Sequence, residues 1–138
     1  MYVPSLLSLS LLTFLSDYIN DGVYGSFNCL MFDHAVALPH VLSLGSSFHV
    51  PASEPLAPCT IWGPTCDSID KICEDASLPA RLQVGDWLGF EGMGAYTICA
   101  ASRFNGFEVS RVLYTASGAG EGEVRAALAR FAGMGYGM

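Results

Sequence analysis

From Tyr18 onward, short apolar or aromatic runs alternate with clusters of glycine, proline, asparagine and serine. Runs this short, broken this often, are typical of β-strands joined by turns, and they leave little room for long helices. The candidate strands are those in which β-branched and aromatic residues concentrate: Gly25–Leu30, Thr60–Trp62, Trp87–Phe90, Thr97–Ala101 and Val112–Thr115. Val50–Pro58 contains three prolines and is predicted to be an exposed connection. The sequence therefore predicts a mainly β fold.

Two helices are predicted to interrupt the strands. The first begins at Asp67, which suits an N-cap, and it ends before Pro79. Its apolar residues would share one face: Ile69, Ile72 and Cys73. The second lies at the C-terminus, where acidic residues precede an apolar stripe at helical spacing and Gly133 can end the run. Its residues are Glu121, Glu123, Val124, Ala127, Leu128 and Phe131.

Length and charge limit the size and the partners of the chain. Its 138 residues are 51% hydrophobic, which is enough to bury one core but not two. The formal net charge is −7, and all six lysines and arginines lie at or after Lys71. Because no basic stripe could follow a phosphate backbone, nucleic acid is excluded as a partner.

The N-terminus carries an apolar run, Leu6–Leu15. It has no preceding positive charge and no small-residue cleavage site, and it is shorter than the roughly 18–20 residues that span a bilayer. It is therefore predicted to be neither a signal peptide nor a membrane anchor. Two interpretations stay open: a buried strand or helix, or a start that does not belong to the ancestral protein.

The five cysteines form no C-x-x-C pair, and the chain has no N-glycosylation sequon. We expect reduced thiols and a cytoplasmic location. Four of the five are interpreted as small buried apolar residues: Cys29, Cys59, Cys73 and Cys99. Cys66 is considered separately.

Common site motifs are weak. The histidines at positions 34, 40 and 49 lack the spacing of a helical metal pair, so no metal is assigned. Gly92–Tyr96 is followed by threonine where a dinucleotide-binding fingerprint needs its third glycine. Gly118, Gly120 and Gly122 are predicted to be a lead into the last helix rather than a phosphate loop.

Cys66 and Asp67 place a thiol beside a carboxylate at a turn. A helix N-terminus and a neighbouring carboxylate act on a thiol in opposite directions, so Cys66 could keep its proton near neutrality. A thiol donor beside an anion that binds a cation is a plausible catalytic pair. The spacing alone also leaves a purely structural role open.

Six segments, in order, closely resemble the C-terminal β domain of eukaryotic ornithine decarboxylases. They are Asn20–Cys29, Phe32–Ala35, Trp62–Asp70, Val84–Leu88, Met93–Thr97 and Phe104–Phe107. The resemblance covers about residues 18–117, with 1–17 as an unmatched apolar leader and 118–138 as a glycine-rich lead and C-terminal helix. It implies a Greek-key-like β-barrel or sandwich, similar to the C-terminal domain of alanine racemase.

The resemblance also implies a homodimeric enzyme that uses pyridoxal 5′-phosphate to convert L-ornithine to putrescine and carbon dioxide, with active sites between subunits. By position, Cys66 resembles the thiol that returns a proton to the substrate carbon. Asp67 and Asp33 resemble carboxylates that bind the distal ammonium, and Phe32 stands where the family often has tyrosine. Tyr96 resembles the residue that bonds the cofactor phosphate. Three further residues match supporting positions: Tyr24, Asp70 and Phe104.

The family also needs an N-terminal barrel with a cofactor-binding lysine, a glycine-rich phosphate loop and an acidic residue facing the pyridine nitrogen. The single lysine here, Lys71, matches no such position. The isolated chain is therefore predicted to be inactive and not to bind the cofactor, and Met1–Asp17 is interpreted as the product of a truncated gene or misplaced start. Two alternatives remain: a non-catalytic relative like the antizyme inhibitors, with antizyme as a possible partner, and a structural β module. The intact Gly94–Thr97 motif argues against the former.

Overall fold

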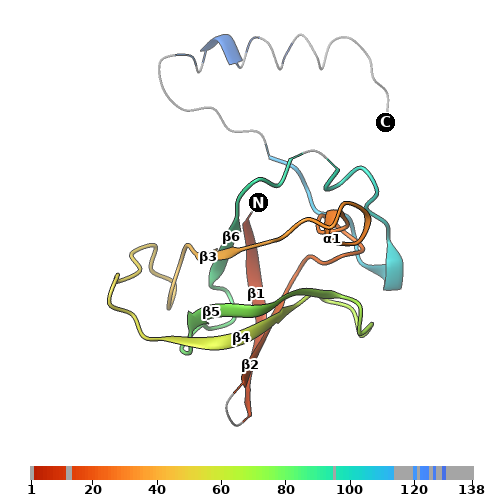
Figure 1. The fold of residues 1–138 in the computed structure, drawn as a ribbon. Helices are drawn as coiled ribbons and strands as arrows, with labels where there is room; N and C mark the ends of the chain where they lie inside the picture. The colour runs from red at the N-terminus through yellow and green to blue at the C-terminus, as the bar shows by residue number, and fades with distance from the viewer. Residues whose placement is uncertain are drawn as a thin grey trace.

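The computed structural model describes residues 2–11, 14–94, 96–113, 120, 122–124, 126 and 129 (Figure 1). Among these residues six strands form one sheet. They are β1 (Tyr2–Leu11), β2 (Phe14–Ile19), β3 (Pro39–Val41), β4 (Leu56–Trp62), β5 (Lys71–Pro79) and β6 (Trp87–Phe90). A one-turn helix, α1 (Cys29–Phe32), and a 3₁₀ turn, η1 (Phe104–Gly106), lie outside the sheet. The mainly β class is confirmed.

The strand order in the sheet is β3-β6-β1-β2-β4-β5. All neighbouring pairs are antiparallel except β2 and β4, which run parallel from Leu15 opposite Cys59 to Tyr18 opposite Trp62. The two end strands of this order, β3 and β5, also approach each other, so the sheet is curved. The Greek-key-like barrel or sandwich stays a prediction.

The apolar leader is part of the sheet. Most of the run Leu6–Leu15 lies in β1 and at the start of β2, and β1 pairs with both β2 and β6. The described residues of this run are therefore strand rather than helix. Its interpretation as a start that does not belong to the ancestral protein stays a prediction. No helix among the described residues is long and apolar enough to cross a membrane.

The prediction of a helix after Cys66 is wrong. Asp67–Asp70 forms a turn, and the chain then continues as β5, in which Cys73 pairs with Ile61 and Lys71 with Trp62. Pairing with β4 outweighs the helical spacing of Ile69, Ile72 and Cys73, because three apolar residues cannot distinguish a short helix from a strand. The predicted C-terminal helix falls largely on residues outside those that the structure describes.

The strand predictions have mixed outcomes. Thr60–Trp62 lies within β4, and Trp87–Phe90 is β6. The prediction of a strand over Gly25–Leu30 is wrong, because this segment forms turns that lead into α1. The prediction of a strand over Thr97–Ala101 is also wrong, because this segment contains turns and bends but no strand. Residues 112 and 113 are not in a strand, and the rest of that candidate lies outside the described residues. The connection predicted over Val50–Pro58 ends earlier, because β4 already begins at Leu56.

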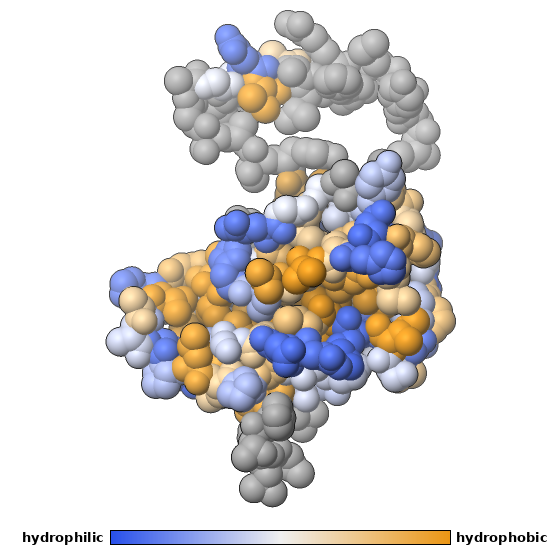
Figure 2. Space-filling view, viewed as in Figure 1, coloured by the Kyte–Doolittle hydropathy of each residue, from blue (hydrophilic) through white to orange (hydrophobic). Residues whose placement is uncertain are grey.

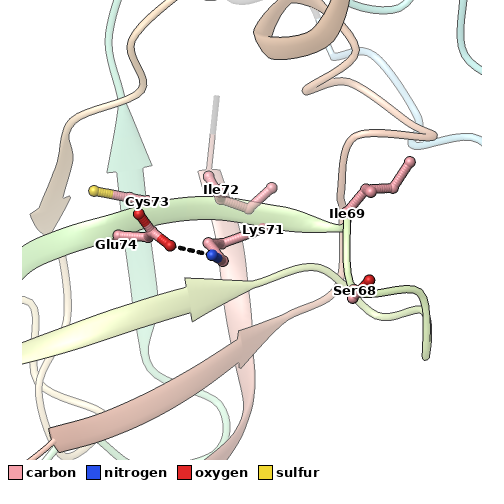
Figure 3. A pocket seen from close by; sticks show the side chains of 6 residues that line it. All are labelled: Ser68, Ile69, Lys71, Ile72, Cys73 and Glu74. Carbon is pink, nitrogen blue, oxygen red and sulfur yellow. Dashed lines mark hydrogen bonds and ion pairs between the residues drawn. The ribbon is translucent and has the colours of Figure 1, made fainter.

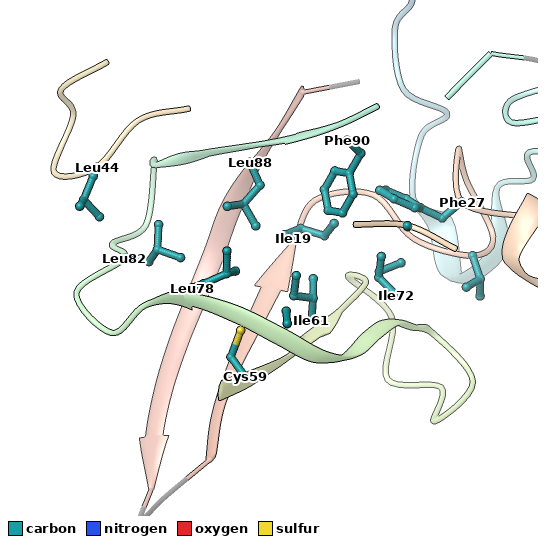
Figure 4. Close-up of a cluster of buried hydrophobic side chains, with 13 residues drawn as sticks. Ile19, Phe27, Leu44, Cys59, Ile61, Ile72, Leu78, Leu82, Leu88 and Phe90 are labelled. Carbon is teal, nitrogen blue, oxygen red and sulfur yellow. The ribbon is translucent and has the colours of Figure 1, made fainter. Parts of the chain in front are cut away.

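Apolar side chains from the sheet and from the β2–β3 connection form one core (Figure 4). Ile19, Ile61 and Leu88 are fully buried in it, and the ring of Phe27 meets that of Phe90 edge to face at 4.9 Å between centroids. The segment that follows β2 is therefore anchored to the sheet by Phe27.

The five cysteines are free. Cys29 and Cys59 are buried as expected, and burial raises the pKa of Cys29 and raises the pKa of Cys59 to about 12. Cys73 is half-buried. Cys99 is exposed, so its expected burial is wrong: it lies in the 96–103 segment, which is not a strand.

Candidate functional site

The candidate site lies beyond the ends of β2 and β4. Because these two strands are parallel neighbours, their C-terminal ends reach the same edge of the sheet. The segments that follow them, 20–28 and 63–70, therefore emerge side by side. In Figure 1, α1 and η1 lie at this same side of the molecule.

Asp70 joins the two segments. Its side chain is fully buried and accepts hydrogen bonds from the backbone N–H of Val23 at 2.9 Å, and from the N–H and hydroxyl of Thr65 at 2.9 and 2.6 Å. A Cβ atom added to Gly22 or Gly63 would lie 2.2 or 2.1 Å from Asp70 Oδ1. Only glycine leaves room for this carboxylate, so the two glycines and Asp70 form one unit.

Asp21 plays a similar part within its own segment. It is buried and accepts hydrogen bonds from the N–H groups of Gly22 and Ser26, each at 2.8 Å. Its second oxygen accepts a bond of 2.6 Å from the hydroxyl of Ser110, 89 residues away. A Cβ on Gly25 would lie 2.0 Å from Asp21 Oδ1. Two buried carboxylates therefore shape the loops on which the exposed site residues lie.

Tyr24 and Asp67 connect these loops at the surface. The Tyr24 hydroxyl donates a 2.5 Å hydrogen bond to Asp67 Oδ2, while Asp67 Oδ1 accepts the Ile69 N–H at 3.1 Å. Both bonds lower the pKa of Asp67, and the Tyr24 bond has the larger effect. The Tyr24–Asp67 bond also raises the pKa of Tyr24 to about 12. The Tyr24 ring stacks on Phe104 with centroids 4.0 Å apart. Asp67 is thus an ionised carboxylate whose two oxygens are both oriented.

Cys66 is exposed directly beside this carboxylate. The residue before it, Thr65, is buried and bonded to Asp70. The residue after it, Asp67, is half-buried and bonded to Tyr24. The Cys66 thiol is therefore open to solvent, while the residues on both sides of it are held by hydrogen bonds.

Phe32 and Asp33 lie at the end of α1. The Asp33 N–H donates to the carbonyl of Cys29 at 3.0 Å, which closes the helix, and both side chains are exposed, Phe32 by 71%. The structure thus places Asp33 as an exposed carboxylate at the C-terminal end of α1.

Tyr96 is 69% exposed and has a φ of +58°, a left-handed backbone that is uncommon outside glycine. The next residue, Thr97, is buried, and its carbonyl accepts a hydrogen bond from the side-chain amide of Asn28. Tyr96 therefore extends from a loop that is tied to the segment preceding α1.

Lys71 is the first residue of β5. It lines a shallow hollow of about 350 Å³ together with Ser68, Ile69, Ile72, Cys73 and Glu74 (Figure 3). There its ammonium forms an ion pair with Glu74 and lies 5.2 Å from the centroid of the Trp62 ring. The Lys71 side chain is therefore engaged with two neighbouring groups.

Histidine, cysteine and acidic side chains do not gather into a metal site within the described ranges, where no group of three or more could hold an ion. His34 has a left-handed backbone with a φ of +53° and is exposed, as are His40 and His49.

The sequence did not reveal the contacts that hold these residues. The Tyr24–Asp67 bond spans 43 residues and the Asn28–Thr97 bond spans 69. The Asp21-Gly22 pair signals a turn, but the carboxylate that approaches Gly22 is that of Asp70, far away in the sequence. Asn28 lies within the matching segment Asn20–Cys29, where nothing local indicates its contact with Thr97.

Comparison with known proteins gives a consistent result. The family described as pyridoxal-dependent decarboxylase, C-terminal sheet domain, matches residues 13–94. Ornithine decarboxylase of Schizosaccharomyces pombe is 54% identical over 99 residues, which cover 70% of this chain and 23% of that protein. Antizyme inhibitor 2 of Xenopus laevis is 56% identical over 97 residues, covering 70% of this chain and 20% of that protein.

A solved lysine/ornithine decarboxylase from Vibrio vulnificus, in complex with cadaverine, has the same fold with a TM-score of 0.68 and 35% identity. The match covers 79% of this chain and 28% of that one. The chain thus spans between about a fifth and a quarter of the length of the curated relatives named above.

Proposed function

The chain belongs to the pyridoxal-dependent decarboxylase family, whose C-terminal sheet domain it contains, and we propose that it is the part of an ornithine decarboxylase that supplies the proton donor and substrate carboxylates. The observation that carries this proposal is the exposed thiol of Cys66 beside Asp67, which the Tyr24 bond keeps oriented. Both residues lie in the matched region.

Asp67 and Asp33 would bind the distal ammonium of ornithine, because a cation shielded from water needs anionic partners. The lowered pKa of Asp67 keeps that carboxylate charged throughout the neutral range. Asp33 is exposed at the end of α1, where the rest of the enzyme could bring substrate against it. Phe32, beside it, would contribute an apolar wall.

Cys66 would hold the proton that the substrate carbon receives after carbon dioxide leaves. Pyridoxal phosphate, when bound, withdraws electrons from that carbon. The thiol is exposed, and the backbone on both sides of it is fixed by Asp70 and Tyr24. Such a group can deliver a proton to one face of a bound substrate. Asp70, Tyr24 and Phe104 support this geometry.

Tyr96 would bond the cofactor phosphate through its hydroxyl, which is open to solvent. Lys71 is committed to Glu74 and Trp62 and does not suit the covalent link that the cofactor needs. We therefore expect the chain alone neither to bind the cofactor nor to decarboxylate ornithine.

The exposed surface around the site suits an interface. Apolar side chains remain at the surface on the face seen in Figure 2, and several of the exposed ones follow or flank the site: Met31, Phe32, Val36, Leu38, Phe104 and Phe107. Exposed apolar groups around reactive residues support a site completed by another domain or subunit, as in a homodimer. The same domain would close its curved sheet into a Greek-key-like barrel or sandwich, and its free thiols favour the cytoplasm.

A second candidate is a non-catalytic regulator that binds antizyme, favoured by the 56% identity to antizyme inhibitor 2. The intact Gly94–Thr97 segment and the Cys66–Asp67 pair favour the catalytic proposal. The two proposals differ in whether Cys66 performs chemistry.

The test joins this chain to the N-terminal barrel of a related ornithine decarboxylase and measures carbon dioxide release from ornithine. We expect activity, and we expect Cys66→Ala to lower kcat about 10²-fold or more, as loss of a positioned proton donor does. The matched control is Cys99→Ala, which removes an exposed thiol without an assigned role. Equal activity of the two variants would contradict the role of Cys66, and an inactive fusion that binds antizyme would favour the regulator.

A further inference from the structure

Asn28 is a buried side chain without a role in the proposed chemistry. It is 2% exposed, and its amide nitrogen donates two hydrogen bonds: one of 2.8 Å to the carbonyl of Gly25 and one to the carbonyl of Thr97. Both amide hydrogens are thus used, one within its own turn and one on a loop 69 residues away.

Asn28 also occupies the N-cap of α1, yet its side chain makes no capping hydrogen bond. An asparagine in this position ordinarily accepts a bond from an N–H of the first turn, which stabilises the helix. Here the side chain instead bonds across to the loop that carries Tyr96. Its place in the fold is therefore explained by the contact between the segments rather than by the helix.

The loop that carries Tyr96 depends on the hydrogen bond from Asn28 to the Thr97 carbonyl. A left-handed backbone at a non-glycine residue is strained and persists only where the surroundings enforce it. The Thr97 hydroxyl donates to the carbonyl of Gly94 at 2.8 Å, and Asn28 holds the carbonyl of Thr97. Because the Tyr96 side chain is exposed, these backbone contacts set its direction rather than packing around the ring.

We propose that Asn28 is a positioning residue that couples the two arms of the site, the loop that presents Tyr96 and the α1 turn that leads to Asp33. The side-chain amide of Asn28 bonds both arms, so it would help to position Tyr96, proposed to bind the cofactor phosphate, and Asp33, proposed to bind the substrate ammonium. The identity of these two ligands rests on the proposed function, whereas the coupling between the arms does not.

The test uses the 138-residue chain without cofactor and compares it with Asn28→Asp, a change of the same size that removes both donated bonds. A positive φ gives a strong nuclear Overhauser effect between the amide proton and Hα of the same residue. We expect this signal at Tyr96 in the wild type and its loss in the variant. Amide exchange should rise at least tenfold at 96–98 and at 29–33, relative to amides of β4 and β5.

Asn20→Asp is the matched control, because it makes the same chemical change at an exposed asparagine, and it should leave both arms unchanged. Retention of the Tyr96 signal and of amide protection in Asn28→Asp would overturn the proposal. If that variant does not fold, the wild type decides: scalar coupling between the Asn28 amide nitrogen and the Thr97 carbonyl carbon is expected, and its absence overturns the proposal. No cofactor is involved, so failure of the coupling is distinct from failure of the proposed function.

Discussion

The sheet and the loops beyond the ends of β2 and β4 are stabilised by different interactions. In the sheet, Ile19, Ile61 and Leu88 are fully buried among other apolar side chains. In the loops, Phe27 is buried against the sheet, and the buried carboxylates of Asp21 and Asp70 accept hydrogen bonds from backbone N–H groups. Apolar burial therefore maintains the sheet, whereas the loops depend in addition on hydrogen bonds to buried carboxylates.

This difference suits the site. Apolar packing fixes a side chain by burying it, so it could not hold Cys66 in place and leave its thiol exposed. A carboxylate below the loop can instead fix the backbone and leave the neighbouring side chains exposed. Asp86 acts in the same way elsewhere: burial alone would raise its pKa, but N–H bonds from Ser46, Gln83 and Gly45 outweigh burial and lower it.

The largest effect is expected in the sheet. Leu88→Ala removes a fully buried side chain from the core and should lower the free energy of unfolding by about 2–5 kcal/mol, because it loses apolar burial and leaves a cavity. Urea denaturation measures this change. Val84→Ala is the control, since Val84 is largely exposed and its truncation should have little effect. A similar loss in both variants would mean that the core is not packed around Leu88.

Asp70→Asn tests whether this carboxylate holds the two loops, and it should have the next largest effect on the free energy of unfolding. The amide places a donor where a carboxylate oxygen accepts bonds from Thr65 or Val23, so we expect a loss of about 1.5–3 kcal/mol, the range for hydrogen bonds to charged groups. Amide exchange at Val23 and Thr65 should rise more than in β4. Asp75→Asn, at an exposed position, is the control. Unchanged exchange at both amides would show that Asp70 does not hold the two loops.

Gly63→Ala tests the close approach rather than the charge. The added Cβ would lie 2.1 Å from Asp70 Oδ1, so the carboxylate or the loop must move. We expect a destabilisation of about 1–3 kcal/mol in urea denaturation, as for other overpacked sites. Gly122→Ala adds the same group where no atom lies within 4 Å and should be close to neutral. Equal stability of the two variants would contradict the close approach.

Tyr24→Phe should have the smallest effect on stability and a clear effect on titration. The pKa of Asp67 is lowered mainly by the Tyr24 bond, so in the variant it should rise toward the ordinary aspartate value of about 4. A lowered folded-state pKa gives stability that is present above that ordinary value and is lost as the pH falls through the folded-state pKa. The variant should lose less stability on acidification than the wild type, because the Ile69 N–H still bonds Asp67.

Carboxyl chemical shifts followed by NMR from neutral to acidic pH measure the Asp67 titration. Tyr18→Phe, in β2, is the control and should leave Asp67 unchanged. An Asp67 titration that is the same in Tyr24→Phe as in the wild type would show that the phenol does not set the charge of this carboxylate.

The sequence predicted the part of the fold that local composition determines. The last three residues of β4 and all of β6 are predicted correctly because β-branched and aromatic residues concentrate there. The prediction of a helix at the start of β5 is wrong because pairing with β4 determines the conformation of this segment. The prediction of a strand over Gly25–Leu30 is wrong because Phe27 of this segment packs against Phe90, far away in the sequence.

In the site, too, the local features are visible in the sequence and the long-range contacts are not. The adjacency of Cys66 and Asp67 is visible in the sequence, and so is the resemblance that assigns their roles. The bond from Tyr24 that orients Asp67, and the anchor that Asn28 provides for the Tyr96 loop, join residues that only the folded sheet brings together. Sequence reasoning could name the reactive groups but not what holds them.

The central position of β1 has a consequence for how the chain folds. Tyr2 pairs with Gly89, so one ladder of the first strand cannot form until β6 has left the ribosome. Until then β1 has an open edge in an apolar segment, which is a template for intermolecular pairing. Long-range strand pairing is also slow, typically milliseconds to seconds. We therefore expect yields on refolding to fall as protein concentration rises, with the N-terminal strand as the segment that aggregates.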